Sequence, residues 1–336
     1  MPTAVTIRDV AKYAGVGVGT VSRVLNDSEL VRESTRHKVL EAIEELNYAP
    51  SAAARRLSSG KTMAVGVVVP FFTNPSVVRR LQGIVSILGI SDYDLVLFDV
   101  QNSENRDYLL TNVVQRNAVD GLLIVSLRPS PEDMERFLAA ELPAVMVDVD
   151  LPGFPSVIVN NVIGARQATE HLLDLGHRRI AYLSDYTDNP FNGSPVTDRY
   201  AGYRQALAAA GVPYRPDYYL ESSITREAAS RAASKLLRRE DRPTAFFAYC
   251  DMQAIGIIQA ARELGIGVPE DLAVVGYDGI DTAEYVQLTT IDQSLFESGV
   301  LGAELLLRIM ADDTTEAEDI LLPTELRVRG TTAPPR

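Results

Sequence analysis

The chain has 336 residues, 46% of them hydrophobic, a net charge of −13 and a single cysteine, Cys250. This length exceeds what one hydrophobic core usually holds, so we expect more than one domain. A lone cysteine excludes a disulfide framework within the chain and fits a reducing compartment. No apolar run follows Met1, and no stretch approaches the roughly 20 apolar residues of a membrane span. We therefore expect a cytoplasmic protein without a membrane partner.

The first predicted elements are two short helices joined by a tight corner. Thr6 is suited to cap the first helix, and Ala11 is small enough for two helices to cross closely. Gly15 supplies the positive φ of the corner, and Val21 packs into the crossing from the second helix. This spacing is typical of a helix-turn-helix, which places the start of its second helix in the major groove of DNA.

A third helix is predicted by Val39, Ala42, Ile43 and Leu46, which recur at helical spacing. Pairs of short helices also occur in all-α scaffolds that bind no DNA, and the third helix favours the DNA-binding interpretation over that one. Charge agrees weakly. Up to residue 61, nine Lys and Arg stand against seven Asp and Glu, a net of +2, which leaves −15 for the remainder. Only the N-terminal part is therefore suited to phosphate.

The segment from Pro50 to Lys61 is rich in helix formers. Its helix-forming part, residues 51–60, is shorter than the ~12–15 residues that an isolated helix needs in water, so we expect a helix only when something holds it. A flexible linker is the alternative.

From residue 63 onward, apolar runs of strand length alternate with helical segments. Near-unbroken apolar strands joined by helices predict parallel sheets that are covered on both faces. The pattern pauses at 156–161 and at 288–293, which favours two sheets over one. The predicted strands are 64–69, 95–98, 121–125, 144–147, 180–183, 245–248 and 272–276.

Ligands of open α/β sheets bind beyond the carboxyl ends of the strands, so we expect a cleft lined by the corners that follow them. Charged and amide side chains beside aromatic faces suit a sugar. The alternative for each aspartate is that it only caps the next helix. The candidate ligand-binding residues are Phe72, Asn74, Asp148, Asn161, Tyr186, Phe191, Arg199, Asp251, Asp278 and Gln293.

An enzyme is not expected. The three histidines, His37, His171 and His177, do not lie beside a plausible nucleophile. The sequence has no P-loop and no metal-ligand cluster of Cys and His, so we expect no cofactor and no metal.

The chain resembles the LacI-type (LacI/GalR) transcriptional regulators almost from end to end. The resemblance implies an N-terminal all-α helix-turn-helix head and an α/β two-lobed, periplasmic-binding-protein-like body with parallel sheets. It also implies a head at 1–50, a hinge helix or linker at 51–61, and an effector-binding and dimerisation domain at 62–336. Lobe 1 is expected at about 62–160 and 293–323, and lobe 2 at about 161–291 and 324–336. The matching segments are 6–26, 35–36, 42–50, 54–57 and 171–181.

In this family two hinge helices, one per protomer, pair in the minor groove and insert a leucine, which here is Leu57. Two departures affect the head. Gly19 stands where the family usually has a longer base-reading side chain, so discrimination falls on Val18 and Arg23. Arg32 replaces a helix-capping serine and is expected to hold a phosphate. The candidate DNA contacts are Thr6, Val18, Gly19, Thr20, Ser22, Arg23, Asn26, Arg32, Thr35, Ala54, Arg55 and Leu57.

Arg199 resembles the family's effector-binding arginine. Three departures shift the expected pocket: Asn160 replaces an aspartate, Cys250 replaces an asparagine, and 76–77 replace an aromatic pair. A lone thiol behind an apolar strand is usually a small buried hydrophobe.

We therefore expect a homodimeric repressor that binds a pseudo-palindromic operator and responds allosterically to a small ligand, a sugar or sugar derivative. The alternatives are a corepressor-dependent or activating regulator of the same fold, and a cytoplasmic solute-binding sensor. The tail from 329 to 336 has no leucine heptad that would build a four-chain coiled coil.

Overall fold

The computed structural model describes residues 5–25, 28, 30–48, 61–187, 194–311 and 319–336. In these ranges no helix is long and apolar enough to span a bilayer. Several sequence predictions fall on residues outside them, namely those for Asn26, Ala54, Arg55, Leu57 and Phe191.

The head consists of α1 (Ile7–Ala14), α2 (Val18–Leu25) and α3 (Glu33–Glu45). The hydroxyl of Thr6 donates to the carboxylate of Asp9, which fixes the start of α1. Gly15 ends this helix with a φ of 67°, the left-handed conformation that glycine adopts without strain. The three helices enclose a small core of Val10, Ala11, Val21, Val24, Val39, Ala42 and Tyr48.

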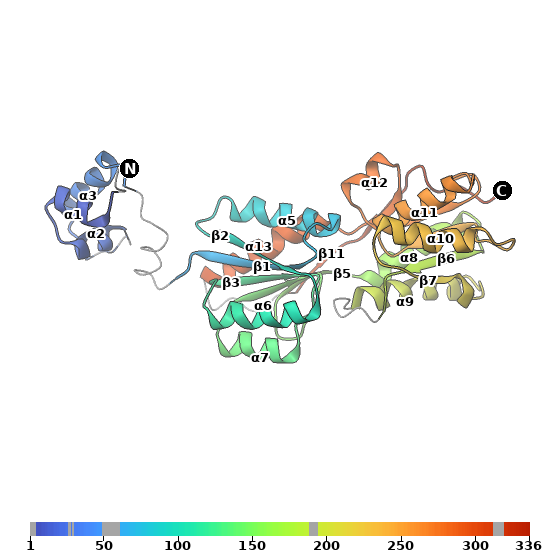
Figure 1. The fold of residues 1–336 in the computed structure, drawn as a ribbon, viewed down its shortest axis with the longest axis horizontal. Coiled ribbons are helices and arrows are strands. Elements are labelled where there is room, and N and C mark those ends of the chain that lie inside the picture. Colours follow the sequence, from blue (N-terminus) through green and yellow to red (C-terminus); the bar gives the residue numbers. More distant parts are fainter. Residues whose placement is uncertain (1–4, 26–27, 29, 49–60, 188–193, 312–318) are drawn as a thin grey trace.

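The first lobe is the central body in Figure 1. It is built on a parallel six-stranded sheet with the order β11-β5-β4-β3-β1-β2. One face packs against α5 (Pro75–Leu88) and α13 (Leu295–Ala311). The other face packs against α6 (Ser103–Gln115) and α7 (Pro131–Ala139). The strands are β1 (Ala64–Pro70), β2 (Asp94–Val100), β3 (Gly121–Val125), β4 (Ala144–Val147), β5 (Ser156–Val159) and β11 (Asp319–Leu322).

The second lobe holds another six-stranded sheet with the order β12-β10-β9-β8-β6-β7. Helices α8 (Asn161–Asp174) and α9 (Ser194–Ala209) cover one face, and α10 (Arg226–Leu237) and α11 (Asp251–Glu263) cover the other. The remaining elements are β6 (Ile180–Ser184), the 3₁₀ turn Pro216–Tyr218, β7 (Tyr219–Glu221), β8 (Ala245–Ala248), β9 (Ala273–Asp278), α12 (Asp281–Tyr285), β10 (Thr289–Asp292) and β12 (Glu325–Arg327).

The chain crosses between the lobes three times, from β5 to α8, from β10 to α13 and from β11 to β12. Only residues 323–324 separate β11 from β12, so the chain keeps its direction as it crosses. Strand β12 is therefore antiparallel to β10, the one such pair in a sheet whose other described pairs are parallel. The carboxyl ends of the parallel strands in both lobes meet at the crossings, which places the cleft there.

Candidate DNA-binding and ligand-binding sites

Helix α2 presents one face to solvent and the other to the core of the head. Val21 and Val24 are buried between the helices, whereas Val18, Gly19 and Arg23 are exposed. The side chains predicted to read base edges therefore lie on the outer face of α2. This geometry suits the insertion of α2 into a major groove, with Arg23 free to reach a guanine edge.

The other predicted DNA contacts in the described part of the head differ in how exposed they are to solvent. Thr20, Ser22 and Thr35 are half-buried. Arg32 is exposed at the N-cap of α3 and makes no side-chain capping hydrogen bond. Thr6 is exposed, and its hydroxyl is engaged with Asp9.

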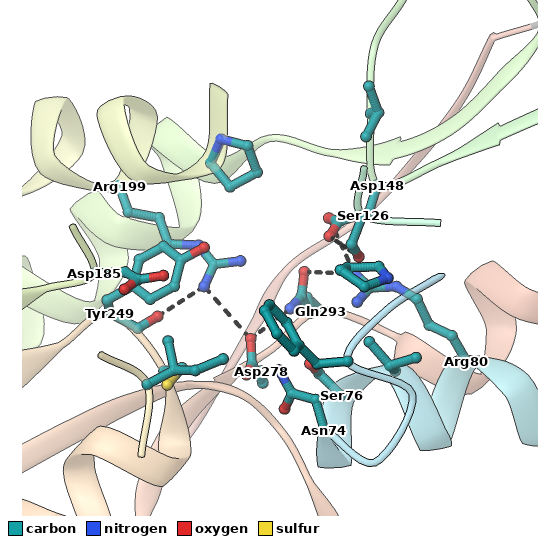
Figure 2. A pocket seen from close by; sticks show the side chains of 17 residues that line it. Asn74, Ser76, Arg80, Ser126, Asp148, Asp185, Arg199, Tyr249, Asp278 and Gln293 are labelled. Atoms are coloured by element: carbon teal, nitrogen blue, oxygen red, sulfur yellow. Dashed lines mark hydrogen bonds and ion pairs between the residues drawn. The ribbon is translucent and has the colours of Figure 1, made fainter. Parts of the chain in front are cut away.

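A cleft of about 100 Å³ lies between the two lobes and is lined by side chains from both (Figure 2). Of the sequence-predicted ligand residues, it brings together Asn74, Asp148, Arg199, Asp278 and Gln293. The other lining residues are Pro70, Phe71, Ser76, Val77, Arg80, Ser126, Val149, Asp185, Pro195, Ile224, Tyr249 and Cys250.

Four non-glycine residues at strand ends around the cleft have backbones in the left-handed region. The φ angles are 47° at Phe71, 51° at Ser126, 67° at Asp148 and 119° at Asp278. Each such conformation costs on the order of 1–3 kcal/mol and persists only where the surrounding structure enforces it. Strained residues are often found at ligand sites, and here all four line the same cavity.

Arg199 is held rigidly on the wall of the second lobe. Its Nε donates to Oδ1 of Asn161 at 2.8 Å, and its Nη1 donates to the carbonyl of Tyr249 at 2.7 Å. The guanidinium also pairs with Asp278 at 3.4 Å. It lies 3.7 Å from the ring centre of Tyr277 and 4.5 Å from that of Tyr249, which adds two cation–π contacts. Figure 2 shows this guanidinium directed into the cleft.

Arg80 occupies the opposite wall, in the first lobe. Its Nη2 lies 3.0 Å from Oδ1 of Asp148 and 3.3 Å from Oε1 of Gln293. Ser126 donates its hydroxyl to the other oxygen of Asp148 at 2.7 Å. Gln293 in turn donates its amide to Asp278 at 2.7 Å. A continuous set of polar contacts therefore crosses the cleft from one lobe to the other (Figure 2).

Sequence reasoning missed Arg80, although a signal was present. Arg80 follows Val77 by three residues and precedes Ile84 by four, so it lies on the buried face of α5. An arginine on an apolar helix face marks a paired or functional charge.

Burial raises the pKa of Asp278 to about 6, against the lowering effect of Arg199 and Arg80, while Asp148 raises it further. The carboxylate is therefore ionised at neutral pH but is easily protonated below it. Burial also raises the pKa of the Cys250 thiol, which favours its protonated form over the reactive thiolate.

Asp251 was predicted to bind ligand, but the structure places it behind the cleft. Its Oδ2 accepts hydrogen bonds from the amides of Gly279 at 2.8 Å and Ile280 at 2.9 Å, and Oδ1 accepts one from the hydroxyl of Thr290. It is fully buried and does not line the cavity. Asp251 instead anchors the loop that follows Asp278.

Three other predicted ligand residues do not line the cavity either. Phe72 is 42% exposed and Tyr186 is 45% exposed. The neighbouring Phe71 faces the cleft instead, because its positive φ changes the direction of the chain after β1. Asn161 acts from behind by orienting Arg199. Among the described residues, no group of three or more His, Cys, Asp or Glu side chains is arranged to hold a metal ion.

A three-helix head that exposes a recognition helix, followed by two lobes around a polar cleft, defines a ligand-responsive DNA-binding regulator. A family profile described as "Bacterial regulatory proteins, lacI family" matches residues 6–51, and one described as "Periplasmic binding protein-like domain" matches residues 169–332. Catabolite control protein A of Priestia megaterium is 34% identical, over 98% of this chain and 99% of that protein.

Solved structures agree with this comparison. A Lac repressor dimer bound to operator and an anti-inducer superposes with a TM-score of 0.82 at 30% identity, covering 98% of this chain and 100% of that one. The complex of the transcriptional regulator CelR with cellobiose gives a TM-score of 0.71 at 32% identity, covering 97% and 99%. The chain belongs to the LacI family, and it is a DNA-binding transcriptional regulator rather than an enzyme.

Proposed function

We propose that the protein is a homodimeric, cytoplasmic transcriptional repressor whose heads bind a pseudo-palindromic operator and whose cleft binds a neutral polyhydroxylated ligand, a sugar or sugar derivative. The observation that carries the ligand class is the buried pair of Arg199 and Asp278 directed into the cleft. A guanidinium donates and a carboxylate accepts, so together they bind adjacent hydroxyl groups. Phe71, at the edge of the cleft, adds an apolar face for the C–H side of a sugar ring.

The charges in the cleft support a neutral ligand over an anionic one. Arg80 and Arg199 contribute two positive charges, and Asp148, Asp185 and Asp278 contribute three negative ones when all are ionised. The net charge of the lining is then −1, and a ligand carboxylate or phosphate would add to it in a poorly solvated site. The named cellobiose complex of CelR, a relative with the same architecture, agrees with this choice.

The proposed dimer contact lies on α5 and the edge strand β2. Val85 on α5 and Ile90, just after this helix, are 53% and 87% exposed, and Leu97 on β2 is 38% exposed. An unpaired strand edge beside exposed apolar side chains favours association with another protein surface, here a second copy of the chain. The Lac repressor dimer described above supports this assembly. Val85→Asp is therefore expected to shift the protein from dimer to monomer in sedimentation velocity, whereas Tyr108→Asp, an exposed change on α6, leaves the dimer intact.

Two linked measurements test the proposal. First, the purified protein selects a site from random duplexes, and its affinity for that site is compared with its affinity for a scrambled duplex at physiological salt. Second, neutral sugars, sugar acids and sugar phosphates are screened by thermal shift, and each stabilising compound is titrated into the protein–operator complex. We expect a neutral sugar to stabilise the protein and to change operator affinity.

The direction of this change identifies the ligand: an inducer lowers operator affinity, and a corepressor raises it. Stabilisation by charged compounds alone contradicts the proposed ligand class. Equal affinity for selected and scrambled duplexes contradicts the repressor itself.

A further inference from the structure

The cleft holds one arginine in a position that the helix packing fixes closely. Arg80 is 2% exposed on α5, which crosses α13 with almost no space between the two backbones. A Cβ added at Gly299 would lie 2.1 Å from the carbonyl oxygen of Arg80, and one added at Gly83 would lie 2.1 Å from the carbonyl oxygen of Phe296. The two glycines therefore allow a contact that fixes the base of the Arg80 side chain.

The guanidinium of Arg80 reaches the second lobe through a single intermediate. Its Nη2 donates to Gln293 at 3.3 Å, and Gln293 donates to Asp278 at 2.7 Å. Gln293 lies where the chain passes from β10 to α13, so this route runs through one of the three crossings. The Nε of Arg80 is also buried at the cleft and has no hydrogen-bond partner in the described part of the chain.

We propose that Arg80 is a positioning residue of the ligand site: through Gln293 it orients the carboxylate of Asp278 and holds the two lobes together before a ligand binds. This inference rests on the proposed function, because it takes Asp278 as a ligand contact. A ligand hydroxyl that donates a hydrogen bond to Asp278 competes with the amide of Gln293. Displacement of this amide alters the hydrogen bond between Gln293 and Arg80. Because Arg80 belongs to α5, this change reaches the helix whose outer face carries the proposed dimer contact.

The adjacent Arg79 provides a matched control. Its Nε lies 3.7 Å from a carboxylate oxygen of Asp281, so it also joins the first lobe to the second. The two side chains are 39% and 67% exposed, however, and exposed ion pairs contribute little to an equilibrium in water. Removal of Arg80 instead leaves buried polar partners unsatisfied, which shifts an equilibrium by on the order of tenfold or more. The same substitution at 79 and 80 therefore separates a cross-lobe contact at the rim from one inside the cleft.

The composition of the chain offers a clean reporter, since it contains no tryptophan. Phe71→Trp places a single indole at the cleft in the full-length protein. Arg80→Leu, Arg80→Lys, Gln293→Ala and Arg79→Leu are then compared in this background without added ligand. The readouts are the wavelength of maximum emission, the acrylamide quenching constant and the thermal unfolding midpoint.

We expect Arg80→Leu and Gln293→Ala each to move the emission to longer wavelength and to increase quenching, because the cleft opens to water. Arg80→Lys is expected to give an intermediate result, since the ammonium keeps the charge beside Asp148 but loses the fork. The double variant at 80 and 293 is expected to match Arg80→Leu, because both changes break the same path. Arg79→Leu is expected to match the parent.

A lower unfolding midpoint for Arg80→Leu with unchanged emission and quenching overturns the proposal, because it shows a purely structural role. Equal quenching in Arg80→Leu and Arg79→Leu overturns it as well. If Arg80→Leu does not fold, Gln293→Ala decides the question, since it keeps Arg80 and its pairing with Asp148. These readouts need no DNA and no ligand. Failure of operator selection therefore rejects the proposed function but leaves the fluorescence results unchanged, so the two failures are distinguishable.

Discussion

Replacement of Arg199 by leucine is expected to weaken both the fold of the second lobe and ligand binding. The substitution removes the hydrogen bonds to Asn161 and Tyr249 and leaves the buried carboxylate of Asp278 without its nearest charge partner in that lobe. Breaking a buried pair in this way typically costs about 3–5 kcal/mol of unfolding free energy. The two ring contacts of Arg199 place the expected loss at the upper end of this range.

Urea unfolding of the full-length variant, followed by circular dichroism, measures this loss. Arg204→Leu is the control, because Arg204 lies on the same helix and also stacks on a tyrosine ring, 3.8 Å from the centre of Tyr214, but is exposed. The control is expected to lose less than about 1 kcal/mol, as exposed cation–π contacts do. An Arg199→Leu protein that unfolds within about 1 kcal/mol of the wild type refutes the view of Arg199 as a buried, partnered charge.

Three further predictions concern the cleft, the head and the hinge segment. Because folding raises the pKa of Asp278 from 3.8 to about 6, its contribution to the free energy of unfolding falls as pH rises through this window. Ligand binding to the ionised carboxylate strengthens over the same window. Asp278→Asn is expected to remove both contributions, as measured by unfolding and ligand titrations at a series of pH values. Arg23→Ala is expected to cost about 1–3 kcal/mol on the selected operator and to relax preference at one base pair; an equal loss on random DNA in gel-shift titrations indicates phosphate contact alone. Leu57→Ala is expected to weaken operator binding without changing sedimentation, and unchanged affinity rejects the intercalating role.

The sequence was most informative where local chemistry determines the structure. The left-handed corner at Gly15 and the spacing of Ala11 and Val21 predicted the head, because these constraints act over about ten consecutive residues. Short apolar runs that alternate with helical segments predicted the central strands, because a strand buried on both faces is apolar throughout. Strands β7, β11 and β12 were not predicted, since they are only three or four residues long and partly exposed. Strands β5 and β10 were not predicted either: they are four residues long and lie where the alternation of apolar runs and helices pauses.

The cleft was harder to predict because its residues meet only through the tertiary structure. The position of Phe71 depends on a strained φ that no residue pattern reveals, so the choice of Phe72 missed by one position. Asp251 satisfies two amides that come from a loop 28 and 29 residues away in sequence. Aspartates that bind ligands and aspartates that support loops are the same residue type at similar positions after strands, and only the contacts separate them.

The three crossings between the lobes also affect folding during synthesis, because the first lobe is built from segments that are far apart in the sequence. The first lobe has its strands β1 to β5 synthesised by residue 159, but α13 and β11 emerge only after residues 295 and 319. Until then, part of the apolar face formed by Val65, Val67 and Leu123 lacks the helix that covers it. A nascent chain therefore exposes this apolar surface while the whole second lobe is translated, and surface of this kind promotes misassociation.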